Sequence, residues 1–345
     1  MNNKVVFPRE DWMEASPESQ GIDSCRLKAA MDYLKQEASH VGIEEVVLVR
    51  NGYMIWKGNQ IGNRHVVYSC TKSFTSTVLG LLVDDGACTL DTLAADYLPY
   101  LKEKYSKIAL KHFATMTSGY NAIGHTYDED GSLNPFVPNE PMFSPGTKFM
   151  YWDDATNLYG NVLTRIANES MKDFFKRRIA DKIGMSNWDW IGFGEIDGLY
   201  VCSGAGNNER GIMISARDMA RFGLLYLNKG CWNGEQLLSE SWVLNATGPQ
   251  VPYYIPFIVY PSRPHLDGRG IYGFNWWVNG VKFNGERRFT KAPINTFFAS
   301  GYCNNKCFVI PEWNMVFVML GTEPKRITDD TFNEFLGMLG DAIVN

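Results

Sequence analysis

Segments typical of β-strands occur near both ends of this 345-residue chain, and the long stretch between them does not continue the pattern. Residues 45–50 and 53–57 are rich in β-branched and aromatic residues and flank Asn51-Gly52, which favours a hairpin turn. Near the C-terminus three more such segments follow, at residues 295–303, 306–311 and 315–320. We therefore expect an antiparallel sheet built from both ends of the chain, with a helical insertion between them.

Helical periodicity fills much of the remaining sequence. Apolar residues recur at helical spacing in four segments, residues 23–38, 73–83, 215–225 and 329–343. The predicted fold is α/β (α+β): an antiparallel β-sheet flanked by helices, plus an all-helical domain. We expect residues 1–67 and 196–345 to form the sheet domain and residues 68–195, which contain many breaking prolines, to form the mainly helical one. Residues 120–147 predict a long loop, and such loops are usually functional lids or rims.

Charge and composition exclude several classes of function. The formal net charge is −5, and Lys and Arg are scattered, so the chain offers no basic stripe for nucleic acid or an anionic membrane. The first residues lack the apolar core of a secretory signal, which predicts a cytoplasmic protein with free thiols at its seven cysteines. The five histidines are isolated, so we expect no metal site and no cofactor.

Ser69-Cys70-Thr71-Lys72, at the start of an apolar helical run, is the strongest candidate for chemistry. Helix residues three apart share a face, so the side chains of Ser69 and Lys72 should meet. A serine hydroxyl needs an activating group, and burial would favour the neutral amine that a base requires. Four residues alone leave open the alternative of a helix-capping serine and a solvated lysine. Cys70 is a rival nucleophile, but it should point away from Lys72 and serve packing.

Two later segments supply the other parts that acyl transfer needs. Tyr151 follows a Pro-Gly turn in a short extended run, and its phenol can relay protons if a nearby ammonium lowers its pKa. The alternative role for Tyr151 is a packed core aromatic. Gly301 lies in a predicted strand, where it would let a bound acyl group approach the backbone. The N–H groups of Tyr302 and Ser69 could then hold an oxyanion.

Together these motifs resemble a known family. The ordered series Ser69-Cys70-Thr71-Lys72, Pro145-Gly146-Thr147 with Tyr151, and Ala299-Ser300-Gly301 resembles the serine β-lactamase-like, penicillin-recognising hydrolases. The likeness is closest to their class C β-lactamase, esterase and 6-aminohexanoate-oligomer hydrolase branch. It implies the β-lactamase/transpeptidase-like fold. It also implies that Ser69 is acylated, Lys72 activates it, Tyr151 is general base and acid, and the Tyr302 N–H completes the oxyanion hole beside Gly301.

Two motifs depart from the family pattern. The family's Y-x-N reads Tyr151-Trp152-Asp153 here, and its K-T-G reads Ala299-Ser300-Gly301. Loss of a charge-assisted contact to a buried anion costs on the order of 1.5–3 kcal/mol, and Asp153 would repel the same anion. β-Lactamase activity is therefore disfavoured. Asp153 or Asp154 could instead receive a substrate ammonium, and Trp152 and Ser300 complete the candidate substrate contacts.

The sequence thus predicts a serine hydrolase that cleaves small esters or amides through an acyl-enzyme on Ser69, of the carboxylesterase or oligomer-amidase type. A β-lactamase or D-amino-acid peptidase is the alternative within enzymes. A catalytically silent scaffold that senses a ligand in the same cleft is the alternative of another class. We expect a small-molecule substrate, no nucleic acid and no membrane as partners, and the oligomeric state stays open.

Overall fold

A six-stranded antiparallel sheet joins the two ends of the chain. The computed structural model describes residues 5–38, 42–123, 134–259 and 264–344. The strand order is β2-β1-β12-β11-β10-β9. Their bounds are β1 (Val46–Arg50), β2 (Tyr53–Lys57), β9 (Trp277–Val278), β10 (Phe297–Ser300), β11 (Lys306–Ile310) and β12 (Met315–Met319). Central β1 pairs with β12, which confirms the predicted sheet from both termini. The β1–β2 turn has positive φ at Asn51 and Gly52, as this pair predicts.

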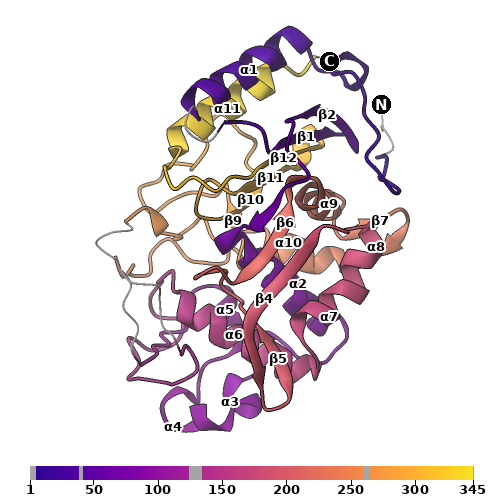
Figure 1. The fold of residues 1–345 in the computed structure, drawn as a ribbon. Coiled ribbons are helices and arrows are strands. Elements are labelled where there is room, and N and C mark those ends of the chain that lie inside the picture. Colours follow the sequence, from indigo (N-terminus) through magenta and orange to yellow (C-terminus); the bar gives the residue numbers. More distant parts are fainter. Residues whose placement is uncertain (1–4, 39–41, 124–133, 260–263, 345) are drawn as a thin grey trace.

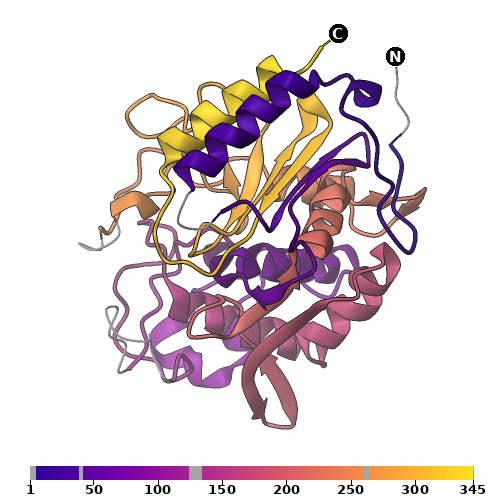
Figure 2. The same cartoon turned by 45° about the horizontal axis from the view of Figure 1, so that its top comes forward.

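Strand alternation sorts the sheet's side chains into two cores. Leu48 and Phe317 lie opposite each other and face the terminal helices α1 (Ser24–Glu37) and α11 (Asp329–Asp341), which lie side by side over this face (Figures 1 and 2). Val47 and Val318 face the other way, toward α9 (Ala216–Leu227) and the helical part of the molecule. The sheet is therefore buried on both faces.

The predicted helix starts are confirmed by their caps. The Asp23 side chain accepts the N–H of Arg26 at 2.9 Å to begin α1. The Ser215 hydroxyl likewise accepts the N–H of Asp218 to begin α9. The Asp218 carboxylate itself accepts the N–H groups of residues 186–187, so it ties the segment before β4 to this helix.

Short helices surround one buried helix in the lower half of Figure 1. That helix is α2 (Thr71–Asp84), whose residues 71–82 are all buried. Around or beside it are α3 (Ala94–Tyr97), α4 (Lys102–Tyr105), α5 (Leu110–Ala114), α6 (Asp153–Ala167), α7 (Met171–Phe175), α8 (Asp181–Ile183) and, after α9, α10 (Glu240–Ala246). No helix in the described part of the chain combines the length and the apolar character needed to cross a bilayer.

A second sheet was not expected. It has the order β3-β6-β4-β5, with bounds β3 (Arg64–Val66), β4 (Trp188–Ile196), β5 (Leu199–Cys202) and β6 (Gly211–Ser215), and β7 (Cys231–Trp232) pairs with β8 (Glu235–Gln236) elsewhere. The part expected to be mainly helical, residues 68–195, therefore ends in a strand that was not predicted, because β4 begins at residue 188. β4 gains its strand structure from pairing with β6, and the domain boundary proposed near residue 195 falls at its end.

The predicted loop at 120–147 is only partly described, because residues 124–133 lie outside the described residues. Its described parts contain no helix or strand. Backbone hydrogen bonds hold it in place: Ile123 N–H donates to Val137 O at 2.9 Å, and Met142 N–H donates to Gly119 O at 3.0 Å. This loop therefore has an ordered base, packed against the helical half.

Candidate active site

Ser69 lies in a single 3-10 turn, Tyr68–Cys70, directly before α2. Tyr68 has φ 48°, which is a costly left-handed conformation for a tyrosine and needs support from its surroundings. Gly206 gives that support, because a Cβ at Gly206 would lie 2.0 Å from the Tyr68 carbonyl oxygen. The Thr71 hydroxyl accepts the N–H of Ile212 at 2.9 Å, which ties the start of α2 to β6. The turn is thus clamped between two segments.

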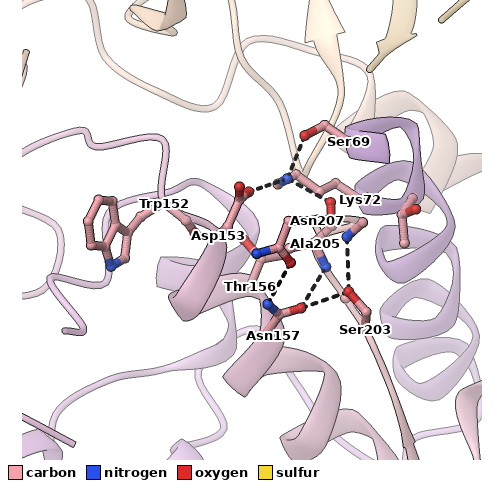
Figure 3. Close-up of polar contacts among 12 residues, drawn as sticks. Ser69, Lys72, Trp152, Asp153, Thr156, Asn157, Ser203, Ala205 and Asn207 are labelled. Carbon is pink, nitrogen blue, oxygen red and sulfur yellow. Dashed lines mark hydrogen bonds and ion pairs between the residues drawn. The ribbon is translucent and has the colours of Figure 1, made fainter. Parts of the chain in front are cut away.

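Lys72 meets Ser69, as the spacing predicts. Its Nζ lies 2.9 Å from Ser69 Oγ, 2.7 Å from Asp153 Oδ1 and 2.8 Å from the Ala205 carbonyl oxygen (Figure 3). The lysine side chain is 1% exposed. We expected burial to favour a neutral amine, and the structure corrects this: a carboxylate at ion-pair distance stabilises the ammonium.

A small polar network sets the position of the Ala205 carbonyl (Figure 3). The Asn157 side-chain oxygen accepts the Ser203 hydroxyl at 2.9 Å and the Ala205 N–H at 3.2 Å. Its amide nitrogen donates to the Asn207 side chain at 2.9 Å. Asn157 stands on α6, which also begins with Asp153. Helix α6 therefore provides one acceptor for Lys72 directly, the Asp153 carboxylate, and orients a second one, the Ala205 carbonyl. The segment that contains Ala205 was not predicted as part of the site. Its run of small residues, 203–206, was the signal in the sequence that could have indicated it.

Tyr151 is brought to the same place by an extended segment. The Met150 N–H donates to Met116 O at 2.9 Å, which fixes the run before the tyrosine. The Tyr151 ring stacks on Trp277, with centroids 5.7 Å apart, and Lys72 Nζ lies 4.8 Å from its centre. The tyrosine is 7% exposed, but it lines the same cavity as Ser69. It is therefore both a packed aromatic and a neighbour of the candidate nucleophile.

The end of β10 lies against the turn that carries Ser69. A Cβ at Gly301 would lie 2.1 Å from the Val67 carbonyl oxygen. The group that approaches Gly301 closely is thus the chain's own backbone. This adds a structural reason for a glycine here to the predicted one, which was that a bound acyl group could approach the backbone. Tyr302 follows and is 59% exposed. Within the described parts of the chain, no acceptor receives its N–H, whereas Gly301 N–H donates to Asn305 O at 2.8 Å.

These residues line a cavity of about 650 Å³. Of the predicted site residues, Ser69, Tyr151, Asp153, Ser300, Gly301 and Tyr302 border it. Trp152 does not: it is 4% exposed within the core, and Figure 3 shows it turned away from Ser69 and Lys72. Asp154 is fully buried and lies outside the lining. The predicted contacts of Trp152 and Asp154 with substrate therefore have no support in this geometry. The described residues of the 120–147 loop do not reach the cavity either.

Cys70 does not compete with Ser69. It is fully buried, and burial raises the pKa of its thiol to about 12, so little thiolate exists at neutral pH. Its Sγ faces the Asn305 carbonyl at 3.4 Å. All seven cysteines are free thiols. Within the described ranges, no three His, Cys, Asp or Glu side chains are grouped so that they could hold a metal ion.

The sequence interpretation also missed a group of charged residues in the lining. Lys306 opens β11 opposite Ser300, and its Nζ donates to Ser300 Oγ at 2.6 Å. Arg288, Arg326 and Asp329 border the cavity at the same end. Only the register of β10 against β11 reveals that Lys306 and Ser300 share a face. No local pattern in the sequence could have done so.

A family model and two relatives show which known proteins this chain is similar to. A family model described as Beta-lactamase matches residues 46–340. The chain is 24% identical to a beta-lactamase of Pseudomonas fluorescens over 123 residues, which are 34% of this chain and 34% of that protein. It is 20% identical to the 6-aminohexanoate-dimer hydrolase of Paenarthrobacter ureafaciens over 312 residues, 77% of this chain and 76% of the relative.

A solved structure shares the fold. The solved structure of EstCE1, described as a hydrolase with promiscuous acyltransferase activity, matches with a TM-score of 0.67 at 15% identity, covering 91% of this chain and 98% of that one. The chain spans only about a third of the length of the Pseudomonas beta-lactamase that it matches. The family model nevertheless covers far more than half of the chain. This protein therefore belongs to the beta-lactamase family of hydrolases.

Proposed function

We propose that this protein is a serine hydrolase that cleaves small esters or amides through an acyl-enzyme on Ser69. The observation that carries the proposal is the 2.9 Å contact between Lys72 Nζ and Ser69 Oγ, with Ser69 at the wall of a cavity of about 650 Å³. A buried ammonium beside a serine hydroxyl stabilises developing negative charge on the oxygen. The names of one relative, a 6-aminohexanoate-dimer hydrolase, and of one structural neighbour, a hydrolase with promiscuous acyltransferase activity, support the same reaction class.

In this mechanism Tyr151 carries the proton. Ser69 Oγ attacks the carbonyl carbon of the substrate and gives its proton to the Tyr151 phenolate. The Lys72 ammonium, 4.8 Å from the centre of the tyrosine ring, stabilises this phenolate. The N–H groups of Ser69 and Tyr302 hold the oxyanion that forms. Tyr151 then protonates the leaving alkoxide or amine as the carbonyl reforms. Water attacks the acyl-enzyme by the reverse sequence, releasing the acid and restoring Ser69.

Lys72 is assigned the electrostatic role because of its partners. The Asp153 carboxylate and the Ala205 carbonyl are acceptors only, so at least two N–H donors of Lys72 are directed at them. The carboxylate favours the protonated form, which has no lone pair to accept a proton. Tyr151 is therefore the better candidate for the base. Lys72 is the group that makes the hydroxyl groups of Ser69 and Tyr151 more acidic.

The test is active-site labelling with a fluorophosphonate, followed by mass spectrometry of the modified peptide. The protein should be labelled on Ser69, and Ser69→Ala should abolish both the label and turnover of p-nitrophenyl esters. Tyr151→Phe should slow turnover by roughly 10²–10⁴-fold, the usual worth of general acid–base catalysis. Cys70→Ala, which changes the rival nucleophile, should retain the label.

Three results would contradict the proposal. Label that persists on the Ser69→Ala protein, or that maps to Cys70, would remove Ser69 from the role of nucleophile. An unlabelled, inactive wild-type protein that still binds small molecules would favour a ligand-sensing scaffold. Turnover of a chromogenic cephalosporin at a rate that rivals the esters would instead make it a β-lactamase.

A further inference from the structure

One end of the cavity is bordered by two turns whose backbone is strained. Of the described residues, thirteen other than glycine have positive φ, and five of these line the cavity: Tyr68, Asn208, Glu209, Cys303 and Asn304. The first turn, residues 207–210, is closed by a hydrogen bond from its last N–H to its first carbonyl at 3.1 Å. The second, residues 302–305, joins β10 to β11 and is closed in the same way at 3.4 Å. Both central residues of each turn are left-handed, which is costly for a glutamate or a cysteine.

Side-chain hydrogen bonds fix both turns. In the first turn, the Asn207 side chain accepts the side-chain amide of Asn157 from α6 at 2.9 Å. In the second, the Asn304 side chain accepts the N–H of Ile327 at 2.7 Å. Strained backbone that its surroundings hold in this way is concentrated at functional sites. The two turns therefore mark this end of the cavity as a candidate binding surface.

Two tyrosine rings form part of the same wall. The rings of Tyr68 and Tyr302 have their centroids 5.4 Å apart and are nearly perpendicular, at 89°. Both residues line the cavity, and Tyr302 is 59% exposed. A hydrogen bond between the Tyr68 hydroxyl and the Cys303 thiol holds the first ring against the second turn. Aromatic rings attract cations to their electron-rich faces, and rings set at an angle can contact an ammonium group from two sides.

Glu209 brings a negative charge to the same end of the cavity. Within the described ranges its exposed carboxylate forms no ion pair. Burial is the main cause that raises the pKa of the Tyr68 phenol, and the nearby Glu209 carboxylate adds to it. The cations of the lining are engaged elsewhere, because its two arginines pair with Asp329 and its lysine donates to Ser300. A positively charged group is therefore the partner that suits both the rings and the carboxylate.

We propose that Tyr68, Tyr302 and Glu209 form an ammonium-binding subsite at this end of the cavity. This inference rests on the proposed function and narrows it: the preferred substrates are esters or amides that carry a quaternary or protonated ammonium group. Tyr68 directly precedes Ser69 in the chain, so a group bound here belongs to the same substrate whose carbonyl Ser69 attacks. Asp153, first considered for a substrate ammonium, is instead paired with a buried lysine.

The test compares two substrates of equal shape that differ in one positive charge. They are the p-nitrophenyl ester of γ-trimethylammoniobutyrate and its isostere in which carbon replaces the ammonium nitrogen. In the wild-type protein kcat/KM should be higher for the cation by roughly 5–30-fold, as expected for contacts with aromatic faces and one carboxylate at a partly exposed site. Glu209→Gln and Tyr302→Leu should each reduce this ratio several-fold. Glu312→Gln is the control, because it removes an equal charge from an exposed position outside the cavity, and the ratio should not change.

A second pair places the charge on the leaving group. Acetylthiocholine is compared with its uncharged isostere, in which carbon again replaces nitrogen, and thiol release is measured. A preference for the cation in either pair that Glu209→Gln removes supports the subsite and shows on which side of the scissile bond the ammonium lies. A preference that is unchanged in Glu209→Gln and Tyr302→Leu would place the ammonium elsewhere and overturn the inference. Using the ratio cancels any effect of a variant that acts on both substrates alike.

A binding measurement separates this inference from the proposed function. Tetramethylammonium chloride should raise the Tm of the wild-type protein above its value in sodium chloride of the same ionic strength, and this shift should be lost in Glu209→Gln and Tyr302→Leu. If Ser69 is labelled, both members of each pair turn over at equal rates and the two salts give the same Tm, the subsite is refuted while the hydrolase stands. If tetramethylammonium binds but Ser69 is never labelled, the subsite stands and the proposed function fails.

Discussion

Among single residues, Asp153 shows best how the structure changes the meaning of a sequence position. As a departure from the family's Y-x-N it suggested a charge facing the substrate. In the structure its carboxylate pairs with Lys72 at 2.7 Å, and the two side chains are 16% and 1% exposed. Removing one partner of a buried pair leaves the other charge without compensation, which costs more than the pair contributes when intact. Asp153 is therefore first a partner of Lys72.

Asp153→Asn should lower the free energy of unfolding by about 1–3 kcal/mol, because the amide oxygen can still accept a hydrogen bond but no longer carries charge. Urea unfolding at pH 7 measures this. The matched control is Asp197→Asn, since Asp197 pairs with Arg165 at 3.2 Å but is 84% exposed. That change should stay within about 1 kcal/mol. Equal stabilities of the two variants would show that the pair with Lys72 contributes no more than a surface ion pair.

Whether a site residue could be predicted depended on how near its partners lie in the sequence. Ser69 and Lys72 were predicted because helix geometry fixes the relation of residues three apart. The partners of Lys72 were not, since Asp153 and Ala205 stand 81 and 133 residues away. Trp152 was assigned to the site as an aromatic residue that could line the pocket. Residues that are neighbours in sequence can point to opposite sides, and here the tryptophan beside Tyr151 faces the core.

For elements, the decisive contact joins β10 to the turn before α2. Gly301 at the end of β10 and Val67 before Ser69 are so close that a single added methyl group would meet the Val67 carbonyl oxygen at 2.1 Å. This contact brings together the two segments that carry the proposed donors to the oxyanion, the N–H groups of Ser69 and Tyr302.

Gly301→Ala should therefore separate these two segments. We expect the unfolding free energy to fall by about 1–3 kcal/mol, as for overpacking of a filled site, and kcat for p-nitrophenyl esters to fall more than KM changes, because the oxyanion contacts act in the transition state. Gly62→Ala is the control, because a Cβ there meets nothing within 4 Å. If Gly301→Ala matches Gly62→Ala in both kcat and stability, the close contact has no role in the site.

How far elements could be predicted depended on their length and partners. The β1–β2 hairpin and the strands β10 to β12 have strong patterns of their own, and so do the caps of α1 and α9. β3 has three residues and β9 two, and such short segments become strands only through pairing. In the second sheet β3 is short, whereas β4 has nine residues but contains Gly192 and Gly194 at an irregularity in its pairing with β5, and glycines weaken a strand pattern. That sheet was therefore missed, and with it the way in which β6 holds the start of α2.

In the whole molecule, one histidine links the two sheets. His65 lies in β3 of the four-stranded sheet, and its Nε2 is 2.7 Å from Oε2 of Glu45, the residue before β1 of the six-stranded sheet. Its Nδ1 faces the Val66 carbonyl at 3.1 Å, so both ring nitrogens face acceptors. Burial opposes the charged ring, but the bonds to Glu45 and Val66 outweigh it and raise the pKa of His65 above 6.5.

A raised pKa in the folded state makes stability depend on pH in a definite direction. The contribution of His65 is complete below its unfolded pKa of 6.5 and is lost as the pH rises through the higher folded value. The stability difference between wild type and His65→Gln, about 1 kcal/mol for one hydrogen bond, should therefore be largest near pH 6 and narrow toward pH 9 in urea unfolding.

His112→Gln provides the opposite case, because burial lowers the pKa of His112 and its Nδ1 accepts the Ala109 N–H at 3.0 Å. Its stability difference should shrink as the pH falls below 6.5. A His65 difference that is constant with pH would mean that the two sheets are held together without the imidazolium.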